Sequence, residues 1–452
     1  MPAASADMRR LREGPILPTL ARLAVPNVLA MVLTVLVGIA ETYYVGRLGT
    51  PPLAAMALVF PFAMLTQMMS AGAMGGGVSS AVSRALGAGQ PQRAAALAGH
   101  AVVIGLVAGL AYSALMLVGG PWFYRGLGGS GVVLAEAVRY ASVLFAGAVL
   151  VWLSNTLASI LRGTGDMRMP SVTIVLSAAL QIALGGLLGL GAGPVPSFGM
   201  VGVAVGHVVA TAATVVVLWA WLASGRARLR LRLRGLRIER ALLADILRVG
   251  ALACVSPVQS VLTVLIFTGL VAHLGMLPLS GYGIGQRLEF LLIPVAFGIG
   301  VAAVPMVGMA MGAGDVARAR RVAWTAGAMS AFNLGLVGAV VALWPDLWAG
   351  LFTSDPAVLA HARQYLRMAG PAFPFFGLGL TLYFASQGSG RVLGPVLAST
   401  LRLLLVAGAG AWLAAHAAGP AAYFALVAAA MVAYGLATAA AIRLTPWGPR
   451  AA

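Results

Sequence analysis

Three polar side chains that can bind or exchange a proton fall at one depth within otherwise apolar segments. Glu41 lies eight residues before Gly49, which places it roughly 12 Å from the end of its segment if that segment is helical. Gln181 and His207 lie at comparable depths of roughly 15 Å and 14 Å in theirs. Carboxyl groups in low-dielectric surroundings titrate nearer to neutrality than in water, and histidine titrates in the same range. We therefore predict a proton-binding cluster of Glu41, Gln181 and His207.

Only two of the eleven acidic residues, Glu41 and Glu289, sit well inside apolar segments. An ionisable group at such depth costs about 3 kcal/mol or more, which makes it a functional candidate. For His207 a second interpretation stays open, in which the ring only hydrogen-bonds a carbonyl or faces a wet cavity.

Glu289 follows Arg287 by two residues, a spacing that directs the two side chains to different faces of a helix. Either could line a central cavity or pair with another helix. We expect Arg287 to be the one arginine clearly inside a segment. The polar residues predicted to line a substrate pocket are Asn27, Tyr43, Gln67, Asn155, Tyr282, Gln286, Arg287 and Glu289.

The composition indicates a protein of the lipid bilayer. Charged residues make up 9% of the chain, against about 25% in soluble domains. The 29 basic residues are all arginine, give a net charge of +18 and sit mostly between apolar segments, so they indicate membrane topology and not a nucleic-acid partner. The single cysteine, Cys254, excludes a disulfide framework and a cysteine metal site. We expect no bound metal and no cofactor.

Twelve apolar segments are each close to or longer than the ~20 residues that cross a bilayer as a helix. They predict an all-α integral membrane protein with twelve transmembrane helices in two bundles of six. The segments lie near residues 18–46, 53–81, 95–122, 132–160, 169–191, 198–222, 243–273, 278–309, 321–344, 357–386, 393–415 and 419–442.

The two sets of six are an internal repeat. The Ala-Leu-Gly-Ala-Gly run at 85–89 returns as Ala-Met-Gly-Ala-Gly at 310–314, and Tyr140 returns as Tyr365 at the same offset. Duplicated six-helix units are the plan of many secondary transporters, in which two halves rock around a substrate. We predict a cytoplasmic N-terminal tail (1–15), an N-lobe (16–222), a basic cytoplasmic linker (223–242), a C-lobe (243–443) and a C-terminal tail (444–452).

The arginines predict the orientation of the chain. Counted from a cytoplasmic N-terminus, most arginines outside the apolar segments fall on the cytoplasmic side, so both termini should face the cytoplasm. Arg9, Arg10 and Arg12 are not followed by a short apolar core with a cleavage site, which favours a retained tail. The Leu-Arg alternation of the linker could form an interfacial strand or helix, but a loop that touches anionic headgroups is the simpler interpretation.

The sequence resembles the multidrug and toxic compound extrusion (MATE) family from about residue 16 to 443. The resemblance rests on Pro26 to Gly49, which ends Glu-Thr-Tyr-Tyr-Val-Gly-Arg-Leu-Gly, on the two Gly-Ala-Gly runs, and on Arg-Gly-Thr-Gly-Asp at 162–166 with Gln-Gly-Ser-Gly at 387–390. It implies a two-lobed antiporter of twelve helices in the inner (plasma) membrane, which exports cationic or amphipathic organic compounds in exchange for protons or sodium. In this family the first-helix acid is usually Asp, and Glu41 occupies its place.

The departures from the family pattern favour protons over sodium. The resemblance places Gln181, Gly185 and His207 where other members carry Asn, Asp and Thr, and a hard cation such as sodium wants several oxygen ligands. Sodium coupling, a flippase for lipid-linked saccharides and, more distantly, a membrane-embedded transferase stay as alternatives. A flippase should carry more helices and a strongly cationic cavity, and a transferase a paired-acid or His-acid motif near an interface. The expected partners are small organic substrates and the lipid bilayer, with no nucleic acid and a monomeric state.

Overall fold

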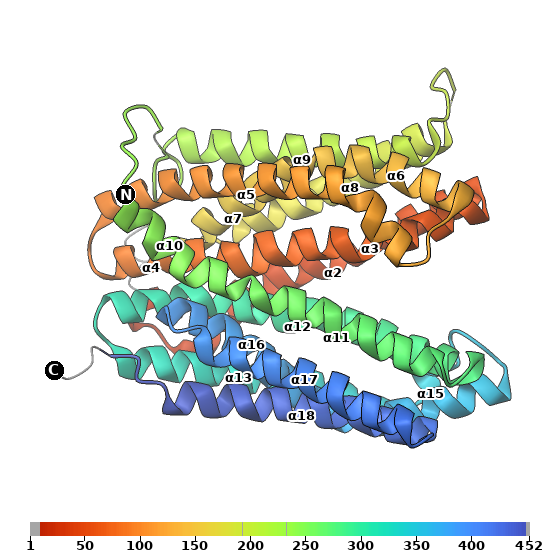
Figure 1. The fold of residues 1–452 in the computed structure, drawn as a ribbon. Coiled ribbons are helices and arrows are strands. Elements are labelled where there is room, and N and C mark those ends of the chain that lie inside the picture. Colours follow the sequence, from red (N-terminus) through yellow and green to blue (C-terminus); the bar gives the residue numbers. More distant parts are fainter. Residues whose placement is uncertain (1–9, 192, 232, 449–452) are drawn as a thin grey trace. The chain divides into compact units, whose positions relative to one another are not determined.

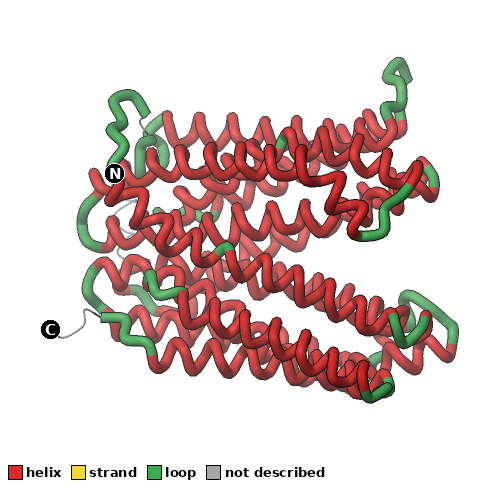
Figure 2. The backbone as a smooth tube through the Cα atoms, viewed as in Figure 1, coloured by secondary structure: helices red, strands yellow, loops and turns green. Residues whose placement is uncertain are grey.

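The chain folds almost entirely into α-helices. The computed structural model describes residues 10–191, 193–231 and 233–448, and no β-strand lies within these ranges (Figures 1 and 2). A helix satisfies its backbone hydrogen bonds internally, which is what an apolar chain in lipid requires. The all-α fold expected from the sequence is confirmed.

The helices of the first half follow one another with short connections. They are α2 (Ile16–Leu48), α3 (Thr50–Gln67), a π-helical stretch (Met68–Met74), α4 (Gly75–Gly87), α5 (Pro91–Gly126), α6 (Gly131–Ala146), α7 (Ala148–Gly163), α8 (Arg168–Leu190) and α9 (Gly199–Ala223).

The second half repeats this order. Its helices are α10 (Arg240–Ala253), α11 (Val255–Ala272), α12 (Met276–Gly312), α13 (Val316–Leu343), α14 (Asp346–Ala349), α15 (Pro356–Ala369), a short 3₁₀ turn (Gly370–Ala372), α16 (Phe373–Ser389), α17 (Leu393–Ala415) and α18 (Pro420–Leu444).

The spans agree with the expected segments. In the described part of the chain, eleven helices or continuous helix runs are long and apolar enough to cross a membrane, and the pair α6 and α7 brings the number to as many as twelve. This pair is bent by 41° at Gly147, a bend that the apolar run at 132–160 did not indicate. Each of the twelve expected segments falls on one of these spans.

Contacts divide the described chain into two compact units. The first unit contains Leu29–Gly250, and the second contains residues 10–28 and 251–448. The division falls inside α2, two residues beyond Pro26, and inside α10 at Gly250. The lobes expected from the sequence divide instead at the linker, and those boundaries stay a prediction. Residues 1–9, Arg232 and residues 449–452 of the expected tails and linker lie outside the described residues.

The internal repeat is present in the backbone. Gly89 and Gly314 adopt φ of 72° and 80°, and Gly165 and Gly390 adopt 82° and 76°. This left-handed region is open to glycine without strain, and it ends a helix in a compact turn. The two halves therefore turn at positions that the sequence repeat makes equivalent.

Helix packing repeats in the same register. A Cβ added to Gly163 would lie 2.9 Å from the Val82 Cβ, and one added to Gly388 would lie 2.8 Å from the Val307 Cβ. Gly388 and Val307 are the residues that the sequence repeat makes equivalent to Gly163 and Val82. In each unit a glycine at the end of one helix thus lets a second helix approach closely, which repeats the packing along with the sequence.

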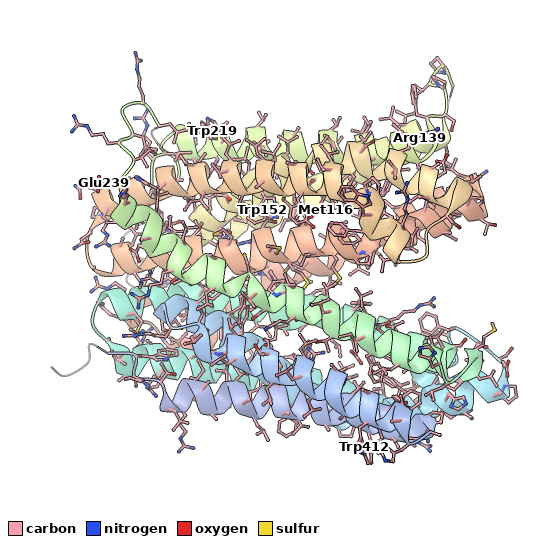
Figure 3. All side chains as sticks on the ribbon, in the orientation of Figure 1. Met116, Arg139, Trp152, Trp219, Glu239 and Trp412 are labelled. Atoms are coloured by element: carbon pink, nitrogen blue, oxygen red, sulfur yellow. The ribbon has the colours of Figure 1, made fainter. Side chains whose placement is uncertain are left out.

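The core of the first unit is built around α5 and α7. Met116 of α5 and Trp152 of α7 are 3% and 2% exposed, and both lie among the helices of this unit in Figure 3. A Cβ at Gly109 of α5 would lie 2.8 Å from the Val149 Cα of α7, so this glycine allows the two backbones to meet. The resulting close packing fixes the frame against which the other helices of the unit are placed.

The described end of the N-terminal tail is docked within the second unit. The Nη2 atom of Arg318 on α13 donates a hydrogen bond to the carbonyl oxygen of Gly14 at 2.7 Å. Leu11 is buried, with 3% of its surface exposed. The side of the membrane on which this tail lies stays a prediction.

Candidate functional site

The structure brings Glu41 and Gln181 together in the first unit. The Gln181 amide Nε2 on α8 donates a hydrogen bond to Glu41 Oε1 on α2 at 2.6 Å. Both side chains are half-buried. The two members of the expected cluster therefore share one hydrogen bond between different spans.

Glycines of α8 explain why α2 lies so close to it. Tyr44 is three residues beyond Glu41 and shares its helix face, and Gly185 is four residues beyond Gln181 on the same face of α8. A Cβ added to Gly186 would come within 3.0 Å of the Tyr44 ring. The missing side chains leave room for this ring, and the carboxyl and the amide meet one turn away.

His207 lies on the next helix without a hydrogen bond to this pair. A Cβ at Gly206 of α9 would lie 2.7 Å from the Gly185 nitrogen of α8, so His207 belongs to the same helix contact. Its backbone oxygen accepts a hydrogen bond from the Thr211 hydroxyl at 2.9 Å. Among the described residues no hydrogen bond to its half-buried ring is found. Its part in the cluster stays a prediction.

Tyr140 is a neighbour of Glu41 that the sequence argument did not assign to the site. It lies on α6, is 5% exposed, and is close enough to Glu41 for the charge of the carboxylate to act on its hydroxyl. The signal for it was present, because Tyr140 is one of the repeated residues.

Two of the expected pocket residues in the first unit form a polar group. The Asn155 amide Nδ2 on α7 donates to Gln67 Oε1 at 3.1 Å and to Ser70 Oγ at 2.8 Å. Gln67 is exposed and Asn155 is half-buried, so this group has access to its surroundings. A third expected residue, Tyr43 on α2, is 59% exposed, and its ring packs edge-on against Tyr44 at 6.0 Å between centroids.

Asn27 belongs to the second unit and is almost fully buried. Its Nδ2 donates to the Gly298 carbonyl oxygen at 3.3 Å, with 1% of the residue exposed. Its Oδ1 atom is buried and has no hydrogen-bond partner among the described residues. The structure thus places Asn27 in a contact between α2 and α12.

The second unit contains its own half-buried carboxyl, Glu289 on α12. The Tyr365 hydroxyl on α15 donates a hydrogen bond to it, and Tyr282 packs edge-on against the Tyr365 ring at 5.4 Å between centroids. Tyr365 is the repeat partner of Tyr140. Each unit therefore places one carboxyl of a span near its copy of the repeated tyrosine. The two acids come from helices that the repeat does not make equivalent, α2 and α12.

Arg287 and Glu289 have different partners, in keeping with their spacing. Arg287 is exposed, and its guanidinium lies 5.1 Å from the centroid of the Phe352 ring. Gln286 beside it is half-buried.

The expectation that Arg287 is the one arginine clearly inside a span is wrong, because Arg402 lies inside α17. Its guanidinium is 5.3 Å from the Phe376 ring centroid and 5.8 Å from that of Tyr434. Its Nε atom is buried and has no hydrogen-bond partner among the described residues. Its charge acts on Glu289. An arginine interrupting the apolar run at 393–415 was a visible signal that the sequence argument passed over.

Each unit combines a carboxyl group within a span with amide, phenol or guanidinium groups. No group of three or more His, Cys, Asp or Glu side chains suited to a metal ion is found in the described ranges. Amide, phenol and guanidinium groups next to single carboxyls can stabilise either protonation state of those carboxyls and can bind polar groups of a ligand.

Comparison with known proteins adds a family assignment to this geometry. The family model described as MatE matches residues 26–187 and 253–413. A relative named FAD transporter, from Shewanella oneidensis, is 25% identical over 411 residues, which cover 88% of each chain. Another, named probable multidrug resistance protein NorM, from Thermotoga maritima, is 25% identical over 387 residues, covering 84% of this chain and 81% of the relative.

A solved structure has the same fold. A MOP superfamily transporter from Pyrococcus furiosus superposes with a TM-score of 0.89 at 24% identity, and the match covers 97% of both chains. Because the superposition covers almost all of both chains, the similarity in fold is not limited to single motifs.

Proposed function

The chain belongs to the MatE family, and from this premise we propose that it is an antiporter that exports cationic or amphipathic organic compounds in exchange for protons. The exporter is a multi-pass protein of the plasma membrane. Relatives named as multidrug resistance proteins support export of organic compounds. The coupling ion is inferred from the residues of this chain.

The observation that carries the proposal is the hydrogen bond between Glu41 and Gln181. An amide can donate to a carboxylate or accept from a carboxylic acid after a rotation, so it serves both protonation states. A carboxyl that keeps a partner in both states can load and release a proton without leaving a buried group unpaired. One carboxylate with an amide offers few oxygen ligands for sodium, which prefers several.

Coupling follows from a difference in proton affinity between two conformations of the exporter. In this proposal Glu41 takes up a proton from outside, α2 repacks near Pro26, and the substrate leaves outward. Loss of the proton towards the cytoplasm resets the site. A ligand shifts such an equilibrium only if it binds the two conformations with different affinity. For the proton, this difference arises if the hydrogen bonding of Glu41 differs between the two conformations.

Dye efflux from proteoliposomes tests the proposal. Purified protein is reconstituted and exposed to an imposed proton gradient, an imposed sodium gradient, or neither. We expect efflux with the proton gradient and a background rate with sodium alone. Efflux driven by sodium at constant pH would contradict proton coupling, and the absence of efflux under both gradients with a panel of cationic dyes would contradict the substrate class.

A second candidate function is export of an anionic aromatic compound. Arg287 and Arg402 lie against aromatic rings in the second unit, and guanidinium groups beside aromatic rings suit planar anions. The relative named FAD transporter gives this candidate a concrete probe. Quenching of flavin fluorescence on binding to the purified protein, lost in Arg402→Gln and kept in Arg391→Gln, would favour it over export of cations.

A further inference from the structure

The connection between α9 and α10 is folded onto the first unit. We call residues 224–239, without the undescribed Arg232, the strap. The Leu231 N–H donates to the Leu222 carbonyl oxygen at 3.1 Å, and Arg228 Nη1 donates to the Thr164 carbonyl oxygen at 2.7 Å. Leu229 and Leu231 are 5% and 6% exposed. The strap is thus anchored by polar and apolar contacts. Its described residues form neither a strand nor a helix.

One end of the strap is held by a buried histidine of α5. His100 is 0% exposed. Its Nε2 atom accepts a hydrogen bond from the Glu239 backbone N–H at 2.9 Å, and its Nδ1 atom lies 2.8 Å from the Ala96 carbonyl oxygen. Glu239 stands at the start of α10, where Figure 3 labels it.

These two contacts fix the charge state of the ring. An N–H group can donate to Nε2 only if that nitrogen has a free lone pair, so the ring proton must sit on Nδ1 and donate to Ala96. The imidazole is therefore neutral, in one tautomer. An imidazolium would carry protons on both nitrogens, and its Nε2–H would face the Glu239 N–H with no acceptor between them.

The residue before His100 makes room for the strap. A Cβ added to Gly99 would lie 2.9 Å from Leu236 Cδ1 and 3.7 Å from Leu233 Cδ2. Two strap leucines therefore rest on the backbone of α5. This apolar contact adjoins the hydrogen bond to His100, so the loss of one weakens the other.

Basic side chains outnumber acidic ones on α5 and on the elements that contact it. The Asp245 carboxylate of α10 is bridged by Arg84 and Arg93 at 2.8 Å and 3.0 Å, which leaves it little free charge. The helices α4, α6 and α7 pack against α5, and α10 and the strap contact it through Asp245, Glu239 and Leu236. The charged and titratable groups on these elements are Arg84 of α4, Glu136, Arg139 and Tyr140 of α6, Arg162 of α7, Arg240, Asp245 and Arg248 of α10, and Arg226, Arg228, Arg230, Arg234, Arg237 and Glu239 of the strap, with Arg93, Tyr112, Tyr124 and Arg125 on α5 itself.

We propose that His100 is a proton-operated latch that holds the strap on the first unit. The neutral imidazole binds the Glu239 N–H and keeps the strap docked. Uptake of a proton at Nε2 replaces this attraction by a clash of two donors next to several arginines, and the strap is released. The latch senses the pH on the side of the membrane where the strap lies, and it acts apart from Glu41.

Hydrogen exchange of strap amides in the purified full-length protein tests the latch. The amides of Leu231 and Leu236 both donate within this region, and their protection is measured at about pH 8 and about pH 5, the range over which histidines change charge. Each rate is divided by the rate of an unstructured chain at the same pH. We expect protection to fall by roughly tenfold at the lower pH, the factor that corresponds to the loss of about one buried hydrogen bond.

Three variants separate the latch from general acid sensitivity. His100→Gln keeps an acceptor that does not titrate, so the strap should stay protected at both pH values. Glu239→Pro removes the donor N–H at the residue just before α10, where no hydrogen bond within the helix uses that N–H, and protection should be low at both. The matched control Glu239→Ala keeps the N–H and should behave as the wild type.

The results decide the proposal without any transport measurement. Protection that is equal at both pH values in the wild type would overturn it. So would a pH step that persists in His100→Gln, or a low protection of Glu239→Ala equal to that of Glu239→Pro. Failure of proton-driven efflux would instead concern Glu41 and leave the latch untouched.

Discussion

Glu41 is held between a hydrogen-bond donor and an apolar helix contact. Gln181 supplies the donor, and the glycines of α8 bring Tyr44 against the same helix. If Glu41 carries the coupling proton, its loss should affect the use of the gradient and leave the fold and substrate contacts intact.

We predict that Glu41→Gln binds substrate but loses gradient-driven efflux, because an amide resembles the protonated carboxyl and cannot release a proton. Glu41→Asp should retain part of the activity, since it keeps the titrating group on a shorter side chain. Efflux from proteoliposomes and dye binding by fluorescence measure the two effects. Glu136→Gln, which removes a carboxyl paired with Arg139 at 3.4 Å on α6, is the matched control. Normal efflux by Glu41→Gln at normal expression would move coupling to Glu289.

For His207 the expected effect lies in the pH profile. We predict that His207→Thr shifts the pH dependence of efflux, because it removes a group that can take up a proton. The added hydroxyl should also create some response to sodium, since it supplies an oxygen ligand. Initial efflux rates are measured across pH with and without sodium. An unchanged profile would reduce His207 to helix packing.

The pair of Glu41 and Gln181 could be predicted from the sequence, whereas the residues around each carboxyl could not, for one physical reason. Depth follows from the constant rise per residue of an α-helix, so two polar groups at one level can be predicted from counting alone. Which helices are neighbours, and which faces meet, depends on packing. The place of Tyr140 beside Glu41, and that of Tyr365 beside Glu289, depend on this packing and could not be obtained by counting residues.

At the scale of elements, the contact between α8 and α9 positions the candidate site. It depends on glycines on both helices, among them Gly185 and Gly206. The lengths of the apolar runs predicted the spans well, because a bilayer sets a minimum helix length. The bend at Gly147 and the π-helical stretch at Met68–Met74 were not predicted, because neither changes the apolar character of the run.

We predict that Gly206→Ala destabilises the protein by about 1–3 kcal/mol, the usual cost of overpacking a close contact. Its Cβ would lie 2.7 Å from a backbone nitrogen, which cannot move as a side-chain end can. Gly46→Ala in α2 is the control, because nothing lies within 4 Å of its added Cβ, and it should be neutral or slightly stabilising. Thermal unfolding of both purified variants measures the difference. Equal melting temperatures would show that the α8 and α9 contact is more adaptable than its geometry indicates.

At the scale of the whole molecule, the repeat and the arginines constrain the orientation together. Six spans return a chain to the side where it began, so two parallel repeats predict both termini and the strap on one side. Most arginines outside the expected spans fall on the side predicted for the termini, while Asp346 and Asp355 follow α13 and fall on the other predicted side. The positive-inside bias then predicts that the arginine-rich side faces the cytoplasm.

Cysteine labelling tests this orientation. In a background in which Cys254, the one cysteine of the chain, is replaced by alanine, single cysteines are placed at Arg234 in the strap, at Arg12 near the N-terminus and at Thr445 after α18. A thiol reagent that does not cross membranes should modify all three only after cells are opened, and should modify Ser354→Cys, in the loop before α15, in intact cells. Arg234 and Ser354 are both exposed, which makes a lack of labelling informative. Labelling of Arg234→Cys from outside would invert the orientation, and the His100 latch would then sense the pH outside the cell.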